Sequence, residues 1–456
     1  MVEVQANKER LLDFVLGTQW DDLNTEVQHQ ALKCFFDLSA VICAGAKNNS
    51  SRKISDYVKD NYPTGTSTIL AGMGGASNLL GASLANGMAA NALDLDDGYS
   101  LLRGHPGAGF FGAILTAAEY SDCSYKDVLT ALAVAYEVAI RQGYAIRNFY
   151  GWDHSSGSWA AFGACAAVCR LLGLNREETE MALGIADFIS PLVPAKRSCY
   201  IPSMNKDGIY WGNHIGMQAA LMSKAGITGK NPVLLGENYT SYINSLGCKW
   251  YMFDLYVKFY SCCRWAHSPI GAVESLMKDN NIQANEIEHV DVYSFGNAGT
   301  LYKKTPTTED EAQYNICYPI AAQILFGHVG PIESSTTRML DERVKPMIDK
   351  IEFHHEPEYD KVFPAKRLSR VEIVLKNGRL LRSEACEPKG DVNATVSLED
   401  LVEKAYAING VYSKKETIEA FIKCVKETDF CEPFSKVFSS IKKLAVENIH
   451  SEIVFI

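Results

Sequence analysis

Apolar residues recur at helical spacing through most of the chain before residue 225. The spacing predicts helices over residues 25–46, 77–93, 110–120, 125–146, 159–172, 176–188 and 211–224, and Asn175 is a suitable N-cap for the helix that follows it. Several of these segments are apolar nearly all round and rich in Ala, Gly and Cys, which is typical of helices that pack closely inside a large all-α domain. Residues 47–76 are polar and Gly-rich and predict a loop region with one short helix.

The pattern changes near residue 268. Alternating apolar positions predict strands at 289–294 and 371–375, and Asn377-Gly378 predicts a two-residue turn, with positive φ at both positions, into a second hairpin strand over 379–385. Helical spacing occurs between these strands, at 309–326 and 336–348. It returns after residue 394, at 398–408, 416–427 and 434–444.

These segments predict a multidomain fold. The expected architecture is a large all-α helical domain built from both chain ends, residues 1–267 and 395–456, with a smaller inserted α+β lid domain at 268–394. Ligand sites favour the crevice between two such domains.

Composition narrows the class of partner. A hydrophobic fraction of 47% and a charged fraction of 21% are typical of a globular protein. The formal net charge of −10 argues against nucleic acid and against an anionic membrane as partners, whereas a small anionic substrate needs only a few placed cations. The first residues do not resemble a signal peptide, and no segment predicts a membrane span. Thirteen cysteines without a leader indicate a reducing compartment, so a cytoplasmic location is expected.

The segment around residues 91–109 carries the first candidate chemistry. Asp94, Asp96 and Asp97 follow an apolar helix, and His105 closes the same loop just before the next helix. A magnesium site for diphosphate chemistry is one interpretation, but no phosphate-binding motif accompanies the aspartates, so no metal is expected. N-capping of a neighbouring helix is a second interpretation. Because the loop also carries an imidazole, we favour catalysis or the orientation of catalytic groups.

Two further histidines and three cations lie in comparable settings. His154 and His267 occupy turns at helix ends, where a side chain can face a cavity, and an imidazole suits proton transfer near neutrality. Lys206, Lys258 and Arg264 are the candidate cations. Arg264 lies among aromatic residues and cysteines and therefore needs an anionic partner, which a substrate carboxylate would supply.

Several segments together resemble the MmgE/PrpD family, in the family's order and over nearly the whole chain: DLDDGYSLLRGHPGAG, GWDH leading into SWAAFGACAAVCRLLGLN, NKDGIYWGN, KFYSCCRWAHSPIGA, EAQYNICYPIAAQIL and VEIVLKNGR followed by KGD. The resemblance implies an all-α domain made from both chain ends, a smaller lid domain and a homodimer. It also implies a cofactor-independent enzyme. The family's known activities include 2-methylcitrate dehydration, cis-aconitate decarboxylation and iminodisuccinate epimerisation.

Carried over by position, the resemblance implies a catalytic set of Asp94, His105, His154, Lys206, His267 and Tyr318. Arg264, Lys258, Cys263 and Asp97 are the expected substrate-binding residues. The expected function is that of a 2-methylcitrate dehydratase-like lyase that abstracts a proton next to a carboxylate of a small di- or tricarboxylic acid. Epimerisation of a related dicarboxylate and cis-aconitate-type decarboxylation remain alternatives. The Cys262-Cys263 pair is either packed thiol or a second acid/base group.

Overall fold

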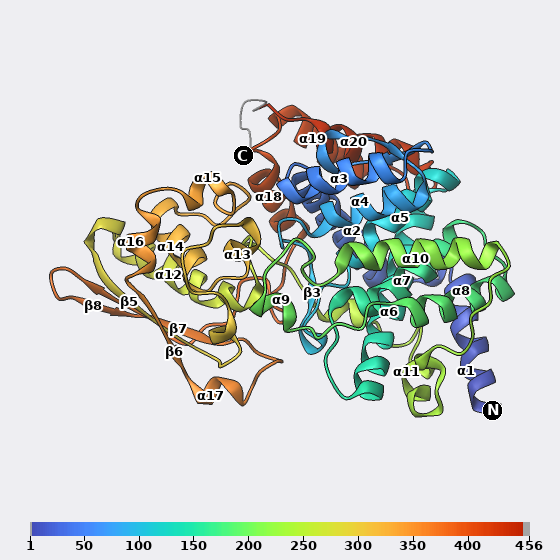
Figure 1. Ribbon diagram of the computed structural model, residues 1–456, viewed down its shortest axis with the longest axis horizontal. Helices are drawn as coiled ribbons and strands as arrows, with labels where there is room; N and C mark the ends of the chain where they lie inside the picture. The colour runs from blue at the N-terminus through green and yellow to red at the C-terminus, as the bar shows by residue number, and fades with distance from the viewer. Residues whose placement is uncertain (1, 450–456) are drawn as a thin grey trace.

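A computed structural model describes residues 2–449 of the protein. The chain forms two bodies, a large helical one and a smaller one that contains a sheet (Figure 1). Each has its own hydrophobic core: one draws on residues 11–252 and 401–445, the other on residues 260–381 together with Cys199. The architecture is therefore mostly helical with two domains, and both chain ends contribute to the larger domain.

The larger domain contains most of the helices. At its centre, helices α4, α5, α7 and α10 pack against one another, and α6 lies against α7. The close approach of α10 to α7 requires a small residue, because a Cβ at Gly216 would lie 2.3 Å from the Cβ of Ala164. The principal helices are α1 (Val2–Leu12), α2 (Thr25–Gly45), α3 (Asn49–Asn61), α4 (Leu79–Asn91), α5 (Ala108–Ser121), α6 (Tyr125–Tyr150), α7 (Ser156–Leu171), α8 (Arg176–Ile189), α9 (Arg197–Tyr200), α10 (Ile209–Lys224), α18 (Leu398–Asn409), α19 (Lys415–Glu427) and α20 (Phe434–Val446).

The predicted cap of α8 is confirmed. Asn175 Oδ1 accepts a hydrogen bond from the Glu178 amide at 2.9 Å, and Glu178 Oε2 accepts one from the Asn175 amide at the same distance. The region 47–76 is more ordered than predicted, since it holds the 13-residue helix α3 and a hairpin of β1 (Ser67–Ile69) and β2 (Gly75–Ser77). The predicted short helix corresponds to α3, whose apolar pattern is weak because it buries three serines and only one apolar residue, Val58.

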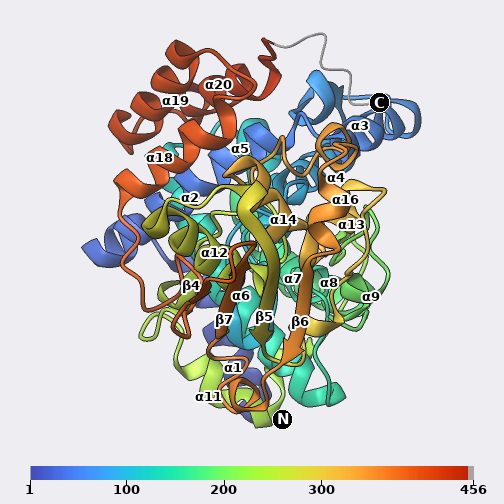
Figure 2. The ribbon, with the colours of Figure 1, turned by 90° about the vertical axis from the view of Figure 1, so that its left-hand side faces the viewer.

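The smaller domain is built on a four-stranded mixed sheet. Its order is β6-β5-β7-β8, with β5 parallel to β6 and the other neighbours antiparallel. Figure 2 shows β6, β5 and β7 side by side. The strands are β5 (Ile287–Ser294), β6 (Ile351–His355), β7 (Ser369–Leu375) and β8 (Leu380–Arg382), and the helices beside them are α12 (His267–Asn280), α13 (Glu309–Gln313), α14 (Cys317–Phe326), α15 (Thr336–Met339) and α16 (Val344–Ile348).

Two predicted features of this domain differ in detail. The helix expected over 309–326 is divided into α13 and α14, because Asn315 Oδ1 accepts hydrogen bonds from the amides of Cys317 and Tyr318 at 2.8 Å and so starts a new helix. The β7–β8 hairpin is confirmed, but its turn is longer than two residues. Only Gly378 has a positive φ, of 84°, and its amide donates to the Leu375 carbonyl.

Two further expectations concern short elements. The helix expected over 336–348 is divided into α15 and α16, and the edge strand β6 follows it without having been predicted. Within residues 2–449, no helix combines the length and the apolar character that crossing a membrane requires.

Candidate active site

The acidic loop begins where α4 ends at Asn91. Asp94 takes up a left-handed conformation with φ 51°, which aspartate tolerates better than most residues, and its amide donates to the Asn91 carbonyl. Asp94 and Asp96 are fully buried and Asp97 is 4% exposed. Three carboxyl groups at such depth need charged or hydrogen-bonding partners.

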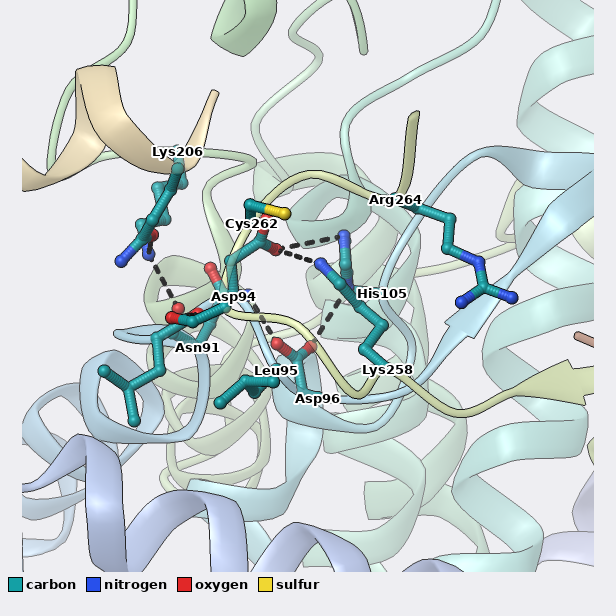
Figure 3. A network of polar contacts seen from close by, with 12 residues as sticks. Asn91, Asp94, Leu95, Asp96, His105, Lys206, Lys258, Cys262 and Arg264 are labelled. Atoms are coloured by element: carbon teal, nitrogen blue, oxygen red, sulfur yellow. Dashed lines mark hydrogen bonds and ion pairs between the residues drawn. The ribbon is translucent and has the colours of Figure 1, made fainter. Parts of the chain in front are cut away.

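His105 is the centre of the cluster. Its Nδ1 lies 3.2 Å from Asp96 Oδ2, and its Nε2 lies 3.5 Å from Asp94 Oδ1 (Figure 3). Burial opposes the charged imidazolium, but the charge of Asp96 and its hydrogen bond outweigh this effect, so the pKa of His105 is raised well above its usual value. Burial likewise opposes ionisation of Asp96, yet His105 holds the pKa of that carboxyl below its usual value. At neutral pH the two form an imidazolium–carboxylate pair.

Lys258 completes the charge balance. Its Nζ lies 2.8 Å from Asp94 Oδ1, and both side chains are inaccessible to solvent. Burial lowers the pKa of Lys258, but the charges of Asp94, Tyr256 and Asp96 together outweigh this effect and raise it above the usual value. The lysine is therefore a fixed positive charge next to the imidazole.

Lys206 connects the loop to the smaller domain. Its Nζ donates to the carbonyls of Asn91 and Ala92, each at 2.8 Å, and to Gln313 Oε1 in α13 at 2.6 Å. These carbonyls lie at the C-terminal end of α4, where a cation is favoured. Burial lowers the pKa of Lys206.

Asp97 faces the opposite side of the loop. Its carboxyl accepts hydrogen bonds from the Tyr136 hydroxyl and, at 3.0 Å, from the Gly107 amide. Burial is the main reason that its pKa is raised to about 7. A Cβ at Gly107 would lie 2.5 Å from Asp97 Oδ2, so this carboxyl and the glycine together fix the turn that carries His105.

A pocket of about 40 Å³ opens beside His105 at the junction of the two domains. Its wall carries three further cations: Arg103 and Lys196 from the larger domain and Arg367 from the smaller one. Arg367 Nη1 donates to Ser100 Oγ at 2.7 Å, which ties the smaller domain to the acidic loop. The remaining lining residues are Ala195, Cys199, Asp207, Tyr256, Cys263, Trp265 and Tyr314.

The pocket wall includes a pair of thiols. The Cys199 thiol interacts with the Cys263 thiol and lowers its pKa. Cys263 is anchored by its amide, which donates to the Gln313 carbonyl at 2.7 Å. Cys262, by contrast, is fully buried, and burial raises the pKa of its thiol well above the usual value.

The structure brings some of the expected site residues together and leaves others aside. Asp94, His105 and Lys258 contact one another, Lys206 joins the same loop through Asn91, and Cys263 faces the adjoining pocket. The Asp97 carboxyl binds Tyr136 and the Gly107 amide on the opposite side of the loop. The other four, His154, His267, Tyr318 and Arg264, are not among the residues that line this pocket in the described chain.

Each of these four has a specific environment. The His154 ring contacts the Trp152 ring in a tilted arrangement with centroids 3.6 Å apart, and burial lowers the pKa of His154 to about 4. Both nitrogens of His267 are engaged, Nε2 with the Cys262 carbonyl at 3.0 Å and Nδ1 with Arg264 Nη1 at 3.3 Å. Burial lowers the pKa of His267 well below its usual value, so the imidazole is neutral.

Arg264 and Tyr318 bind parts of the protein itself. Arg264 Nη1 donates to the Lys389 carbonyl at 2.9 Å, and its guanidinium lies over the Tyr256 ring at 4.5 Å. Its Nη2 lies 3.5 Å from Asp391 Oδ2, which supplies the anionic partner expected for a buried arginine. The Tyr318 hydroxyl donates to the Glu333 carbonyl.

Arg103, Lys196, Cys199 and Arg367 were not predicted. Arg103 stands in the same motif as His105, and this proximity is the one signal that would have found it. Arg367 lies two residues before β7, and the sequence does not indicate that its side chain contacts a loop 267 residues earlier.

Comparison with known proteins gives matches to the same family that the sequence motifs resemble. The model of the MmgE/PrpD N-terminal domain matches residues 9–245, and that of the MmgE/PrpD C-terminal domain matches residues 260–427. The chain is 25% identical over 422 residues to the cis-aconitate decarboxylase-like protein oryM of Aspergillus oryzae, covering 83% of this chain and 86% of that one. It is 24% identical to a cis-aconitate decarboxylase of Aspergillus terreus, covering 81% and 82%, and 22% identical to that of Homo sapiens, covering 79% of each.

Proposed function

The chain belongs to the MmgE/PrpD family, and from this premise we propose that it is a cofactor-independent lyase that decarboxylates a small, unsaturated di- or tricarboxylic acid. The observation that carries the proposal is the imidazolium of His105, held by Asp96 beside a pocket whose wall carries Arg103, Lys196 and Arg367. The cations suit the carboxylates of the substrate, and the imidazolium suits a proton donor.

In the proposed reaction, the carbon–carbon bond to one carboxylate breaks and carbon dioxide leaves. The electron pair stays on the substrate carbon skeleton, where the remaining carboxylates and the pocket cations stabilise the developing charge. His105 then donates its proton to carbon, and solvent returns a proton to the imidazole. Asp96 keeps the imidazole charged before this transfer, and Lys258 balances Asp94.

Among the lyase reactions known in the family, the relatives favour decarboxylation, because three of them are named for cis-aconitate decarboxylation. Dehydration of a 2-methylcitrate-like substrate uses the same acid and the same cations, and it additionally needs a base for the α-proton. His105 is already protonated at neutral pH, so it does not supply that base.

Epimerisation is a second candidate, favoured by one observation. Cys263 lies in the same pocket wall as His105, and its interaction with the Cys199 thiol lowers its pKa. A thiolate and an imidazolium facing one substrate carbon are a base and an acid for exchange of an α-proton.

The test is incubation of the pure protein in D2O with cis-aconitate, 2-methylcitrate, citrate and iminodisuccinate. Decarboxylation releases carbon dioxide and leaves one deuterium on the product, as NMR and mass spectrometry detect. Dehydration gives an alkene without carbon dioxide. Epimerisation places deuterium on the α-carbon and releases nothing. Absence of carbon dioxide with every acid would refute the decarboxylase proposal, and the Cys263→Ser variant would then show whether any exchange depends on the thiol.

A further inference from the structure

The outer face of the small-domain sheet carries a cluster of two imidazoles and two carboxylates. His289 and Asp291 stand on β5, and Glu352 and His354 stand on the neighbouring parallel strand β6. In the sheet register Asp291 pairs with Glu352, and His354 lies two pairs further along, on the same face and opposite Tyr293. Figure 2 shows β5 and β6 next to each other along their length.

The ligand atoms of His289, Asp291 and Glu352 lie close together, and His354 contacts the same carboxylate oxygen of Asp291. Asp291 Oδ1 lies 3.1 Å from His289 Nε2 and 2.6 Å from His354 Nε2. Glu352 Oε2 lies 3.8 Å from His289 Nε2, and the ligand atoms of His289, Asp291 and Glu352 all lie within 4.8 Å of one another. Donor atoms around a tetrahedral zinc ion are separated by about 3.3 Å, given bonds of about 2.0 to 2.1 Å, so small side-chain rotations would place an ion among them.

The surroundings orient one of the two imidazoles. The His354 ring stacks on Tyr293 with centroids 4.7 Å apart and an interplanar angle of 23°. The guanidinium of Arg370, from β7, lies over the Tyr293 ring, 3.5 Å from the ring centroid. Arg370 also forms an ion pair with Glu372. The rings therefore fix the direction of the His354 Nε2 atom, as neighbouring groups do for metal-binding histidines.

From this convergence we propose that His289, Asp291, Glu352 and His354 form a binding site for a divalent transition-metal ion, zinc in the first place. Two imidazoles with two carboxylates suit zinc and its first-row neighbours, whereas calcium and magnesium prefer oxygen ligands alone. The two carboxylates would balance the ion's charge. By joining β6, the edge strand, to β5, the ion would stabilise the smaller domain.

The proposed site is separate from the proposed chemistry. None of its four residues belongs to the lining of the pocket beside His105 in the described chain. Removal of the ion should therefore lower the melting temperature and leave turnover unchanged. The two proposals thus fail independently, since a protein without lyase activity can still bind zinc here.

The test is calorimetric titration of EDTA-treated, reduced full-length protein with zinc chloride. We expect the His289→Ala/His354→Ala variant to lose one equivalent of zinc, or to bind it at least tenfold more weakly, relative to the unaltered chain. His355→Ala is the matched control, because His355 lies on the same strand but pairs with Asp360 at 2.6 Å. Binding by that control should be unchanged.

Free cysteines are the main alternative zinc ligands, and cobalt distinguishes them from this site. The proposed site should bind Co2+ without a thiolate-to-cobalt charge-transfer band, and the double variant should lose that signal. Glu352→Gln, a milder change, should weaken binding while leaving the fold intact. Equal zinc stoichiometry and affinity in the unaltered chain and the double variant would overturn the proposal.

Discussion

His105 Nδ1 lies 3.2 Å from Asp96 Oδ2, and both residues are buried, so each stabilises the charged form of the other. Because the pKa of His105 is raised well above its usual value, the imidazole keeps its proton through neutrality. A proton-donating His105 predicts activity that persists above neutral pH and falls as the pH rises through the raised pKa.

Asp96→Asn tests this relationship. Without the carboxylate, burial and Lys258 both lower the pKa of His105, so the alkaline limb of the kcat/KM profile should move to lower pH. His105→Gln should lower kcat by about 10²-fold or more, since it removes the proton donor. The measurement is the pH dependence of kcat/KM for both variants, with circular dichroism as the check on folding. An alkaline limb that stays in place in Asp96→Asn would contradict the assignment.

The acidic loop shows which features of the site can be predicted from the sequence. The apolar helix before Asp94 indicated that the carboxylates would be buried, and the motif placed His105 next to them. The sequence could not show that Asp96 and Asp97 have different partners. Which partner each carboxylate meets depends on the side of the loop that it faces after the left-handed turn at Asp94. Asp96 meets the imidazole, while Asp97 meets Tyr136 from a helix 39 residues away.

The same limit holds for the fold. The helices of the larger domain follow from their apolar spacing, and the β7–β8 hairpin follows from Asn377-Gly378. Strand β6 was missed because its sequence, IEFHH, keeps only two apolar residues on the inner face and carries the polar cluster on the other. Contacts such as that of Arg367 with Ser100 depend on tertiary packing, which spacing along one chain does not encode.

The raised pKa of Asp97 predicts that the stability of the protein depends on pH. Its pKa is raised from 3.8 to about 7 in the folded protein, so between these values the folded state holds a proton that the unfolded state has lost. Stability from this group is complete below pH 3.8 and decreases as the pH rises through about 7. Asp97→Asn keeps an acceptor for Tyr136 and cannot ionise. Urea unfolding at pH 5 and pH 8 should show a smaller loss of unfolding free energy for the variant, and equal losses would refute the prediction.

Arg367 predicts a defect in substrate binding. Its guanidinium lines the pocket at 1% exposure and can engage a carboxylate in a bidentate manner, which a lysine cannot reproduce. Arg367→Lys should raise KM for the acid by about tenfold or more, with a smaller effect on kcat. Ser100→Ala is the control, because it removes the hydrogen bond at 2.7 Å and leaves the charge. If Ser100→Ala raised KM as much as Arg367→Lys, the arginine would act by holding the domains together.

We expect substitution of Lys206 to lower the stability of the protein, and we expect this effect to be coupled to that of substituting Gln313. The Lys206 ammonium donates to two carbonyls at the end of α4 and to Gln313 Oε1 from the smaller domain, so Lys206→Met removes three hydrogen bonds among buried groups and should cost about 1–3 kcal/mol of unfolding free energy. Gln313→Ala removes the same bridge from the other side, and its effect should not add fully to that of Lys206→Met in a double-mutant cycle. Lys196→Met is the matched control, since that pocket lysine donates to Asn297 Oδ1 at 3.1 Å and not to the Asn91 and Ala92 carbonyls. Additive losses measured by urea unfolding would show that Lys206 and Gln313 stabilise the two domains separately, whereas coupling would identify their hydrogen bond as the contact through which the smaller domain holds the acidic loop beneath the pocket.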